Sequence, residues 1–387
     1  MNLSTKRKIC VLVTARPSYA RIKTVLEHIK KHPDLELQLV VGASALLERY
    51  GPVVDVIRAD GFEPDEVIYS VVEGENLVTS AKSTGLSIIE LASILDKLRP
   101  DAVISIADRY ETLATAIAAS YMNFPVVHIQ GGEVTGSIDE KVRHAVTKLS
   151  DCHFVANDNA AERVLKMGED PETVFVTGCP SIDLADRVQI DTASFNPFDK
   201  YNGVGTKFDL SKGYFVVMQH PVTTEYEASL SQIEATLASI AELQHPTFWF
   251  WPNVDAGSDQ ISKAIRHFRE QNGARNIYLY KNLPPEDFLR LIGKADCLIG
   301  NSSVGIRESA YLGIPVVNIG NRQIGRDRGP NVIDTAYDSA EITPAIRHQL
   351  EHGRYPKAEI YGDGNAGENI AKLLASVTLK TNKKIAY

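Results

Sequence analysis

Short runs of apolar, mostly β-branched residues alternate with amphipathic segments along almost the whole chain, and this alternation constrains the fold more than any other feature. In the first half, the apolar runs lie at residues 8–14, 35–43, 101–108, 125–132 and 152–158. Segments with helical periodicity lie between them, at residues 18–31, 86–98, 111–122 and 138–150. Strands and helices that alternate at this spacing form parallel βαβ units with right-handed crossovers. The first half is therefore predicted to be a doubly wound α/β domain.

The second half repeats the same pattern. Its apolar runs lie at residues 213–221, 247–253, 276–282, 296–303 and 314–320, and its helical segments at residues 229–243, 258–272, 285–294 and 304–312. Residues 186–212 between the halves contain Asn, Pro, Gly and Lys without a strong period, which predicts a linker. A chain of 387 residues is also too long for one core. We expect two doubly wound domains with a cleft between them, and ligands beyond the carboxyl ends of the strands.

Charge and composition exclude several classes of function. The formal net charge is −8, and binding to nucleic acid or anionic membranes draws on an excess of Lys and Arg. The apolar run at residues 9–13 is too short for a signal peptide, and no stretch reaches the roughly 18 apolar residues of a membrane span. The four cysteines are far apart and lack CxxC spacing, which favours buried free thiols. We expect a cytoplasmic protein that binds neither nucleic acid nor membrane.

Polar residues follow two strands of the first half. Arg16 and Ser18 stand where the first strand gives way to a helix, and helix N-termini attract anions. Asp108 and Arg109 follow the strand at residues 101–108. Asp108 is a candidate base or hydroxyl acceptor, and Arg109 could hold Asp108 or a phosphate. The alternatives are a capped helix with a solvated Arg16, and an Asp108 that caps the next helix.

The bend after residues 125–132 carries the densest group of ionisable residues. It includes His128, Gln130, Glu133, Asp139, Glu140, Arg143 and His144, with two glycines at positions 131 and 132. The glycines allow positive φ and a close approach of a ligand. Asp139 and Arg143 lie four residues apart on one helical face, so a local salt bridge is the alternative for that pair. A local salt bridge does not account for His128, Gln130 and Glu133 on the same bend.

The second half presents hydroxyl, amide and cationic groups after its strands. His220 precedes a proline and is held extended, and Asn253 lies in a polar turn. Ser302 and Ser303 stand between a strand and a helix, where hydroxyls and backbone N–H groups can hold an anion. Glu308 follows in that helix, and Arg322 lies with Arg326 and Arg328 near glycines. This local positive region suits a diphosphate, although His220 and the serine pair could each be structural.

Seven motifs in one order resemble those of the hydrolysing UDP-N-acetylglucosamine 2-epimerases, which include the bacterial sialic-acid-pathway enzymes and the epimerase half of the bifunctional animal enzyme. The motifs are DRYE (108–111), HIQGGEVTG (128–136) with RHA (143–145), QHPVTT (219–224), PNVDAGS (252–258), GNSS (300–303) with RE (307–308), NRQIGR (321–326) and YGDGN (361–365). Most of the motifs are weak alone, but seven in register are a strong signal, and the resemblance covers about residues 8–375, which is nearly the whole chain.

The resemblance implies a GT-B fold of two Rossmann-like domains. The N-terminal domain would span residues 1–187, the C-terminal UDP-binding domain would span residues 188–365, and a last helix at about 366–387 would pack back on the first domain. A homo-oligomer, either a dimer or a tetramer, is expected by the same analogy. We expect no metal or other cofactor, because no zinc or EF-hand spacing occurs.

The resemblance also implies a reaction: anti elimination of UDP from UDP-GlcNAc to 2-acetamidoglucal, then hydration to ManNAc. A carboxylate must accept the poorly acidic C2 proton, and the departing diphosphate needs positive charge. The catalytic group implied in this way comprises Asp108, Glu133, Asp139, Glu140, Arg143 and His220. The residues that would bind substrate are Arg16, Ser18, Arg109, His128, Gln130, His144, Asn253, Lys281, Asn282, Ser302, Ser303, Glu308 and Arg322, with Glu308 on the ribose and residues 281–282 reading uracil.

Gln130 departs from the family pattern, which often has Glu at this position and His in other branches. An amide cannot carry the proton, so this position only orients the substrate, or the role moves to Glu133 or Asp108. The difference is also compatible with another sugar, UDP-2,4-diacetamido-2,4,6-trideoxyglucose. A non-hydrolysing epimerase that makes UDP-ManNAc, a GT-B glycosyltransferase and a non-catalytic UDP-sugar sensor would each be compatible with a nucleotide-sugar site of this kind.

Overall fold

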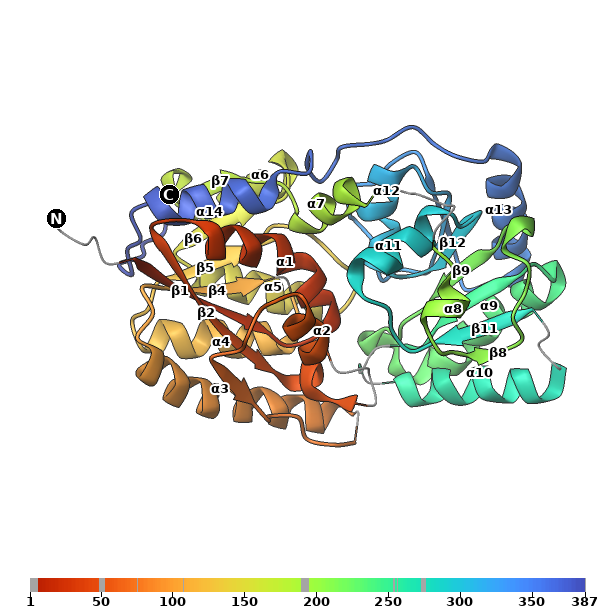
Figure 1. Ribbon diagram of the computed structural model, residues 1–387, viewed down its shortest axis with the longest axis horizontal. Coiled ribbons are helices and arrows are strands. Elements are labelled where there is room, and N and C mark those ends of the chain that lie inside the picture. The colour runs from red at the N-terminus through yellow and green to blue at the C-terminus, as the bar shows by residue number, and fades with distance from the viewer. Residues whose placement is uncertain are drawn as a thin grey trace. The chain divides into compact units, whose positions relative to one another are not determined.

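The computed structural model describes residues 6–48, 53–74, 76–106, 108–188, 195–252, 255, 257–272 and 276–386. The chain forms two compact units, each with its own sheet. Unit 1 comprises Met1–Glu133, Ile138–Leu184 and Tyr361–Tyr387, and unit 2 comprises Val134–Ser137 and Ala185–Ile360. In Figure 1, unit 1 contains the red to yellow segments and the last, dark blue helix, while most of unit 2 runs from green to blue.

Unit 1 contains a seven-stranded sheet in the order β3-β2-β1-β4-β5-β6-β7. All the pairings between these strands are parallel. The strands are β1 (Arg7–Val13), β2 (Leu35–Gly42), β3 (Glu66–Ile68), β4 (Ala102–Ile106), β5 (Val126–Ile129), β6 (Cys152–Val155) and β7 (Val174–Val176). The order reverses between β1 and β4, so the switch point of the sheet, where ligands bind in doubly wound folds, lies after these two strands.

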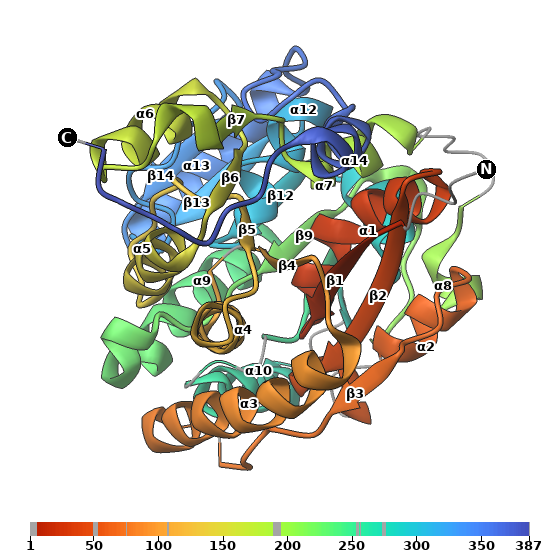
Figure 2. The same cartoon turned by 90° about the vertical axis from the view of Figure 1, so that its left-hand side faces the viewer.

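Helices cover both faces of this sheet because alternate strand residues point to opposite sides. One face carries Ile9, Val11 and Val13 and packs against α1 (Arg16–Lys31), α2 (Val53–Ala59) and α14 (Ala366–Ser376). The other face carries Cys10 and Leu12 and packs against α3 (Leu77–Leu98), α4 (Tyr110–Tyr121) and α5 (Asp139–Leu149). Figure 2 shows α1 and α14 together on one side and α3, α4 and α5 on the other. The segment Ile138–Leu184 of unit 1 also contains α6 (Asp158–Lys166) and the start of α7 (Pro180–Arg187).

Unit 2 repeats the order of the first six strands of unit 1 and has a different seventh strand, β8, at its edge. Its sheet runs β14-β13-β12-β9-β10-β11-β8, and only β8 is antiparallel to its neighbour among the pairings described. The strands are β8 (Val204–Gly205), β9 (Phe215–Met218), β10 (Thr247–Phe250), β11 (Ile277–Tyr280), β12 (Cys297–Gly300), β13 (Val316–Ile319) and β14 (Val332–Thr335). The switch point lies between β9 and β12.

The two faces of the unit 2 sheet differ in the side chains that fill them. Aliphatic residues of α9 (Ser229–Leu243), α10 (Ser258–Asn272) and α13 (Ser339–His352) pack on one face. The opposite face holds an aromatic cluster that includes Phe198, Phe248 and Tyr278. Phe198 comes from α8 (Pro197–Lys200), and Phe288 from α11 (Pro285–Gly293) contacts Phe250 at the same face. The short α12 (Glu308–Leu312) follows β12.

Several predicted elements differ from the structure, and the sequence analysis did not predict seven others, namely α2, β3, α6, β7, α7, α13 and β14. The helix predicted at residues 86–98 begins at Leu77, because its first turns expose apolar residues and so break the amphipathic period. The helix predicted at residues 304–312 is a 3-10 turn, Ser303–Gly305, followed by α12 from Glu308. The predicted linker contains α8 and β8, and the last helix ends at Ser376 rather than at residue 387. No helix among the described residues has the length and hydropathy of a membrane span.

Candidate active site

Asp108 lies just beyond β4, at the switch point of the unit 1 sheet, and two guanidinium groups hold its carboxylate. Arg143 of α5 forms a hydrogen-bonded ion pair with Asp108 Oδ2, and Arg21 of α1 lies 3.6 Å from Oδ1. The N-cap of α4 is Arg109, one residue after Asp108. Asp108 is therefore an ionic link between two helices at the end of the sheet.

Arg143 is the centre of this cluster, and its side chain is only 1% exposed. Burial by itself lowers the pKa of Arg143, but the negative charges of Asp108, Glu133 and Glu140 outweigh burial and raise it above its usual value. The guanidinium donates to the backbone oxygen of Glu133 at 2.8 Å and to Glu140 Oε2 at 3.1 Å. Arg143 thus joins the start of the glycine bend to the first turn of α5.

Glu140 extends the cluster to His144. Its Oε1 lies 2.9 Å from His144 Nε2, one helical turn further along. The i,i+4 spacing pointed to a salt bridge between Asp139 and Arg143, but the carboxylate beside Arg143 in α5 is Glu140, at i,i+3. Asp139 is the first residue of α5 and is partly exposed. The bend and the helix therefore place Asp108, Glu133 and Glu140 around one buried cation.

Gln130 has an unusual backbone and a buried side chain. Its φ is +67°, a left-handed conformation that non-glycine residues rarely adopt and that is often found at functional sites. The side-chain Nε2 lies 2.7 Å from Cys179 Sγ, just before α7, and this thiol lies 3.0 Å from Ser181 Oγ. Among the described residues, Gln130 Oε1 has no hydrogen-bond partner. Gln130 thus ties the bend to the start of α7 and keeps one acceptor for another group.

The two glycines of the bend are required by the protein itself. A Cβ on Gly131 would lie 2.8 Å from His128 Nδ1, and a Cβ on Gly132, where φ is +75°, would lie 2.2 Å from the carbonyl oxygen of Ala160. His128 is fully buried in β5, and its Nδ1 lies 3.1 Å from Thr147 Oγ1 of α5. His128 therefore packs against the bend inside the protein, whereas the family resemblance implied a role in substrate binding.

Other candidates of unit 1 have local partners. Burial lowers the pKa of Arg16 to about 10. The Ser18 hydroxyl accepts from Ala15 N at 2.9 Å and donates to Ala15 O at 2.6 Å, which closes the turn before α1. Arg109 Nε donates to Glu111 Oε2 at 3.2 Å. Ser18 thus acts as a turn residue, while Arg16 is a cation in a desolvated position.

In unit 2, His220 and Asn301 meet at the switch point of the sheet. The Asn301 side chain accepts from His220 N and donates to His220 O, both at 2.8 Å, so it pairs with that backbone as a neighbouring strand would. Gly300, with φ +127°, permits this approach because a Cβ there would lie 2.2 Å from Met218 O. His220 is buried, at 7% exposure. The end of β12 thus fixes the end of β9.

The turn after β12 contains the predicted serines and Glu308. Ser302 and Ser303 are partly exposed, and Ser303 Oγ accepts from Arg307 Nη2 at 2.9 Å. Glu308 is buried at 7% exposure, and its Oε2 lies 3.8 Å from Arg307 Nε but makes no hydrogen bond to any described residue. A carboxylate oxygen in this position is a ready acceptor for a ligand hydroxyl.

The remaining candidates of unit 2 lie on three loops. Arg322 Nη1 donates to Asn301 O at 3.1 Å, and the backbone oxygen of Arg322 accepts from Gly136 N at 3.1 Å. Arg326 donates to Val134 O at 3.1 Å, and Arg328 pairs with Asp334 at 2.9 Å. Lys281 and Asn282 follow β11. Asn253 lies outside the described residues.

Sequence reasoning missed four residues that hold these clusters: Arg21, Cys179, Asn301 and Arg307. Arg21 and Cys179 lie far in sequence from their partners Asp108 and Gln130, so no local pattern could reveal them. Asn301 and Arg307 stand inside the motifs at residues 300–303 and 307–308, where the serines and Glu308 drew attention instead. An asparagine directly after a buried strand was the available signal.

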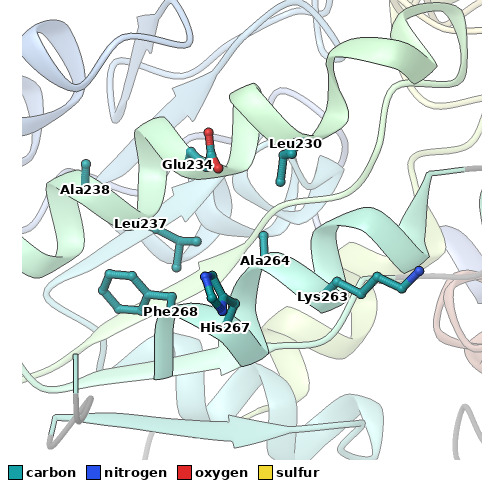
Figure 3. A pocket seen from close by; sticks show the side chains of 8 residues that line it. All are labelled: Leu230, Glu234, Leu237, Ala238, Lys263, Ala264, His267 and Phe268. Atoms are coloured by element: carbon teal, nitrogen blue, oxygen red, sulfur yellow. The ribbon is translucent and has the colours of Figure 1, made fainter. Parts of the chain in front are cut away.

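A groove on unit 2 lacks the features of the strand-end sites. Leu230, Leu237 and Phe268 line a groove between α9 and α10, as Figure 3 shows. The groove lies between two helices and not at the carboxyl ends of strands, and its wall is mostly apolar. Within the part of the chain that the structure describes, no group of three or more His, Cys, Asp or Glu residues could hold a metal ion.

Comparisons of the sequence with known proteins all match the same kind of protein. The family model described as UDP-N-acetylglucosamine 2-epimerase matches residues 27–375. A UDP-N,N'-diacetylbacillosamine 2-epimerase (hydrolyzing) of Legionella pneumophila is 33% identical over 98% of this chain and 100% of its own. A UDP-N-acetylglucosamine 2-epimerase of Neisseria meningitidis is 29% identical over 93% of this chain and 92% of its own.

A solved structure confirms the predicted GT-B fold class. The crystal structure of a Methanocaldococcus jannaschii UDP-GlcNAc 2-epimerase, in complex with UDP-GlcNAc and UDP, superposes with a TM-score of 0.76. The match has 18% identity and covers 95% of this chain and 99% of the other. Both Rossmann-like units therefore belong to a GT-B-like scaffold.

Proposed function

This chain belongs to the UDP-N-acetylglucosamine 2-epimerase family, and we propose that it is a hydrolysing 2-epimerase that converts UDP-GlcNAc and water into ManNAc and UDP. The observation that most supports this proposal is the buried cation Arg143 with Asp108, Glu133 and Glu140 around it. Proton transfer at a sugar carbon needs carboxylates in fixed positions, and a buried guanidinium fixes them.

The proposed reaction has two steps. In the first, a carboxylate accepts the C2 proton, the C2–H electron pair forms the C1=C2 bond, and the C1–O bond breaks so that UDP leaves. In the second, a water oxygen adds to C1, its proton passes to a protein carboxylate, and C2 of the 2-acetamidoglucal receives a proton on the opposite face. The product is the C2 epimer as a free sugar.

We assign the proton transfers to Glu133 and Asp139. Asp108 is a poor proton carrier because two guanidinium groups stabilise its ionised form. Both carboxylate oxygens of Glu140 are already in contacts, one with Arg143 and one with His144. Glu133 is buried at 5% exposure on the bend, and Asp139 opens α5. Asp108 then acts as a positioning residue, because it holds Arg143 and through it the backbone at Glu133.

Unit 2 supplies the groups proposed to hold UDP. Negative charge develops on the departing diphosphate, and His220, Arg322, Ser302 and Ser303 offer cationic or hydrogen-bonding groups for it. Glu308 accepts the ribose hydroxyls through Oε2, the oxygen that has no hydrogen-bond partner among the described residues. Lys281 and Asn282, after β11, remain the proposed readers of the uracil.

A second substrate has its own support. The Legionella pneumophila relative is named for UDP-N,N'-diacetylbacillosamine, whose sugar is a 2,4-diacetamido-2,4,6-trideoxyglucose. Gln130 keeps a buried acceptor oxygen beside the bend, and such an oxygen can accept from an N–H on the sugar. The same elimination and hydration would then act on this sugar and release the corresponding 2-epimer.

Product analysis in deuterium oxide tests the reaction. The protein is incubated separately with UDP-GlcNAc and with UDP-N,N'-diacetylbacillosamine, and the products are followed by NMR. We expect free UDP and a 2-epimerised free sugar that carries deuterium at C2. The sugar with the higher kcat/KM is the substrate.

Three other results would contradict parts of the proposal. Accumulation of the UDP-linked epimer without free sugar would indicate a non-hydrolysing enzyme. A released epimer with hydrogen retained at C2 would contradict the elimination. Tight binding of UDP to the protein without turnover of either sugar would leave only a binding function.

A further inference from the structure

The segment after α14 is held against unit 1 up to its end. It comprises residues 377–386 and contains no helix or strand. Figure 2 shows it in dark blue, running from α14 towards α5 and α6. Val377 and Leu379 pack against the unit 1 core. Ala386 N donates to Gly168 O at 3.0 Å, just beyond α6. The segment is therefore fixed well after its last core contact.

Lys383 of this segment uses all three donors of its ammonium group. Its Nζ donates to the backbone oxygens of Thr147 at 3.0 Å and of Ser150 at 2.6 Å, and it lies 2.5 Å from Glu169 Oε2. An ammonium has three N–H donors and no acceptor, so these partners use its full capacity. Burial lowers the pKa of Lys383 even though the carboxylate of Glu169 opposes this shift. Lys383 is thus a specific contact and not a solvated surface charge.

Two of these partners are carbonyl oxygens at the C-terminus of α5. Thr147 lies in the last turn of α5, and Ser150 is its C-cap. The last carbonyl groups of a helix lack partners within the helix, and partial negative charge gathers there. Lys383 supplies both hydrogen-bond donors and a positive charge at this end. It caps α5 from a position 236 residues after Thr147 in the chain.

Thr147 connects this contact to the cluster at the switch point. Its hydroxyl donates to the backbone oxygen of Arg143 at 3.1 Å, and it lies 3.1 Å from Nδ1 of His128. Arg143 in turn pairs with Asp108 and donates to the backbone oxygen of Glu133. The same threonine therefore takes part in the ammonium contact and in the contacts around the buried guanidinium.

The contacts of Lys383 differ from those of the other lysine beside Glu169. Lys148 belongs to α5 itself, and its side chain donates to Met167 O at 2.9 Å and to Glu169 Oε1 at 2.7 Å. A side chain that extends from the helix on a flexible stem restricts the helix backbone only weakly. Lys383 instead binds the α5 backbone directly. A purely stabilising role in the Glu169 cluster would require the carboxylate contact but not the two carbonyl contacts.

We propose that Lys383 is a positioning residue for the reaction, which holds the C-terminus of α5 so that the first turns of this helix keep their place at the switch point. The inference rests on the proposed function, in which Asp139 opens α5 and Arg143 fixes the backbone at Glu133. Helix α5 has 11 residues and is therefore about 16 Å long. A shift of so short a helix moves both ends, and misplacements on the order of 1 Å can be costly for a reaction.

Steady-state kinetics of Lys383→Met test the positioning role. The change keeps an apolar stem but removes the charge and all three donors. We expect kcat to fall by about tenfold to a hundredfold. KM should stay within about twofold, because the proposal assigns UDP to unit 2. Lys384→Met is the matched control, since Lys384 is the next residue and is exposed. It should leave both parameters unchanged.

Lys148→Met separates positioning from stability. It removes another ion pair from Glu169 but leaves the carbonyl oxygens of Thr147 and Ser150 bonded to Lys383. Urea unfolding should show similar losses of stability for Lys148→Met and Lys383→Met. Only Lys383→Met should lower kcat strongly, measured where circular dichroism shows that both variants are folded. Equal falls in kcat would assign Lys383 to stability alone.

Chemical restoration of the ammonium gives a second test. Lys383→Cys should lower kcat as Lys383→Met does. Alkylation of its thiol with 2-bromoethylamine rebuilds a side chain that has the length and the ammonium group of lysine, and it should restore most of the lost kcat. The native cysteines Cys10, Cys152, Cys179 and Cys297 are buried, which favours reaction at position 383. Lys384→Cys with the same treatment is the control. A folded, fully alkylated protein without recovery would contradict the proposal.

Hydrogen exchange tests the structural link without reference to activity. In Lys383→Met, the amides of α5 should exchange faster than in the unaltered protein, from its C-terminus back to the turn at Arg143. Lys384→Met should leave this exchange unchanged. Unaltered exchange throughout α5 in Lys383→Met would overturn the proposal.

Failure of this inference can be distinguished from failure of the proposed function. If the unaltered protein turns over neither UDP-sugar, the proposed function fails, and the positioning role for that reaction fails with it, whatever the exchange result. If the unaltered protein is active and folded Lys383→Met keeps its kcat, the positioning role is overturned while the proposed function stands.

Discussion

The two units have the same strand order but different chemistry at the same topological position. Unit 1 runs β3-β2-β1-β4-β5-β6, and unit 2 runs β11-β10-β9-β12-β13-β14, each from the third strand of its own series to the sixth. At the switch point of unit 1, Asp108 lies in ion pairs with Arg21 and Arg143. At the switch point of unit 2, the corresponding link is neutral, from the amide of Asn301 to the backbone of His220.

Under the proposed function, the two units have different tasks. Proton transfer needs carboxylates whose positions and charge states are controlled, and buried arginines provide this control in unit 1. Anchoring a nucleotide needs a rigid edge with spare acceptors and donors, and the proposal assigns this task to unit 2, where the amide of Asn301 links the ends of β9 and β12. Changes in unit 1 should therefore affect turnover and pH response, whereas changes in unit 2 should affect substrate binding.

Glu133→Gln should have the largest effect and tests whether the chemistry resides in unit 1. The amide keeps the shape of the side chain but cannot carry a proton, so kcat should fall by about 10²–10⁴. The measurement is UDP release under saturating substrate. Glu162→Gln on the exposed surface of α6 is the control and should retain full activity. A loss of less than about tenfold would move the base away from Glu133.

Arg143→Leu tests whether the ionic link of unit 1 is also structural. Its removal leaves Asp108 as a buried charge with one cation fewer, so the free energy of unfolding should fall by about 3–5 kcal/mol. Asn301→Ala at the corresponding place in unit 2 should cost about 1–3 kcal/mol, since the buried groups it leaves unbonded are neutral. Arg347→Leu breaks an exposed pair with Glu242 and should cost under about 1 kcal/mol. Urea unfolding of the three variants gives the order, and equal losses would contradict the contrast between units.

Acid should destabilise unit 1 through a second ionic cluster. Glu169 is buried, and its partners are His153 of β6 at 2.9 Å, Lys148 of α5 at 2.7 Å and Lys383 at 2.5 Å. Burial alone would raise the pKa of Glu169, but the hydrogen bonds from these three side chains lower it to about 2 from 4.5. Burial lowers the pKa of His153 despite the neighbouring carboxylate.

The sign of the pH effect follows from these directions. A lowered carboxyl pKa stabilises the fold fully above pH 4.5, and this stabilisation is lost between pH 4.5 and about 2. A pKa difference of one corresponds to about 1.36 kcal/mol, so the protonation of Glu169 should lower the free energy of unfolding by about 3 kcal/mol. The lowered pKa of His153 adds a loss that begins as the pH falls below 6.5. Urea unfolding at a series of pH values should show a steep loss of stability between pH 4.5 and about 2 that Glu169→Gln removes; an unchanged slope in this range would contradict the assignment.

Glu308→Gln tests the binding task of unit 2. The amide accepts a ribose hydroxyl less well than the carboxylate, in the ground state and the transition state alike. KM should therefore rise about tenfold while kcat changes by less than about twofold. Glu341→Gln on α13 is the control, and steady-state kinetics distinguish the two parameters. A fall in kcat with unchanged KM would place Glu308 in the chemistry.

Gln130→Glu should have the smallest effect. If the side chain only orients the sugar, turnover should stay within about tenfold, a barrier change near 1.4 kcal/mol. The ratio of kcat/KM for the two UDP-sugars should shift more than either kcat, because the acceptor oxygen beside the bend then carries a charge. A large gain in kcat would instead show that position 130 can supply the proton carrier.

The sequence predicted most of the fold because periodicity is local. The helices at residues 229–243 and 258–272 have the predicted bounds, and each predicted apolar run contains a strand, with β1 beginning one residue before its run. The exceptions have tertiary causes. The edge strand β8 exists only through its pairing with β11, and the start of α3 does not follow an amphipathic pattern because Leu77 and Val78 face away from the core.

The candidate site divides in the same way. The predicted strand ends and the two glycines of the bend led us to place Asp108, Gln130, Glu133 and His220 after strands, where parallel sheets bind ligands. Spacing along α5 paired Arg143 with Asp139, but the fold pairs it with Glu140 and, across the switch point, with Asp108. His128 and Ser18 looked like ligand groups in the sequence, yet each has its polar contact inside the protein. Local sequence cannot tell these cases apart, since their partners or their burial depend on packing.

The sequence by itself determined that this chain forms two parallel α/β units and which polar residues stand at the ends of their strands, because hydrophobic periodicity and turn residues act over a few neighbours. Only the tertiary structure decided which carboxylates are held by arginines, which hydroxyls and imidazoles serve the packing, and which helix face stays exposed. Those properties depend on burial and on partners such as Arg21 and Cys179, which approach their sites from distant parts of the chain.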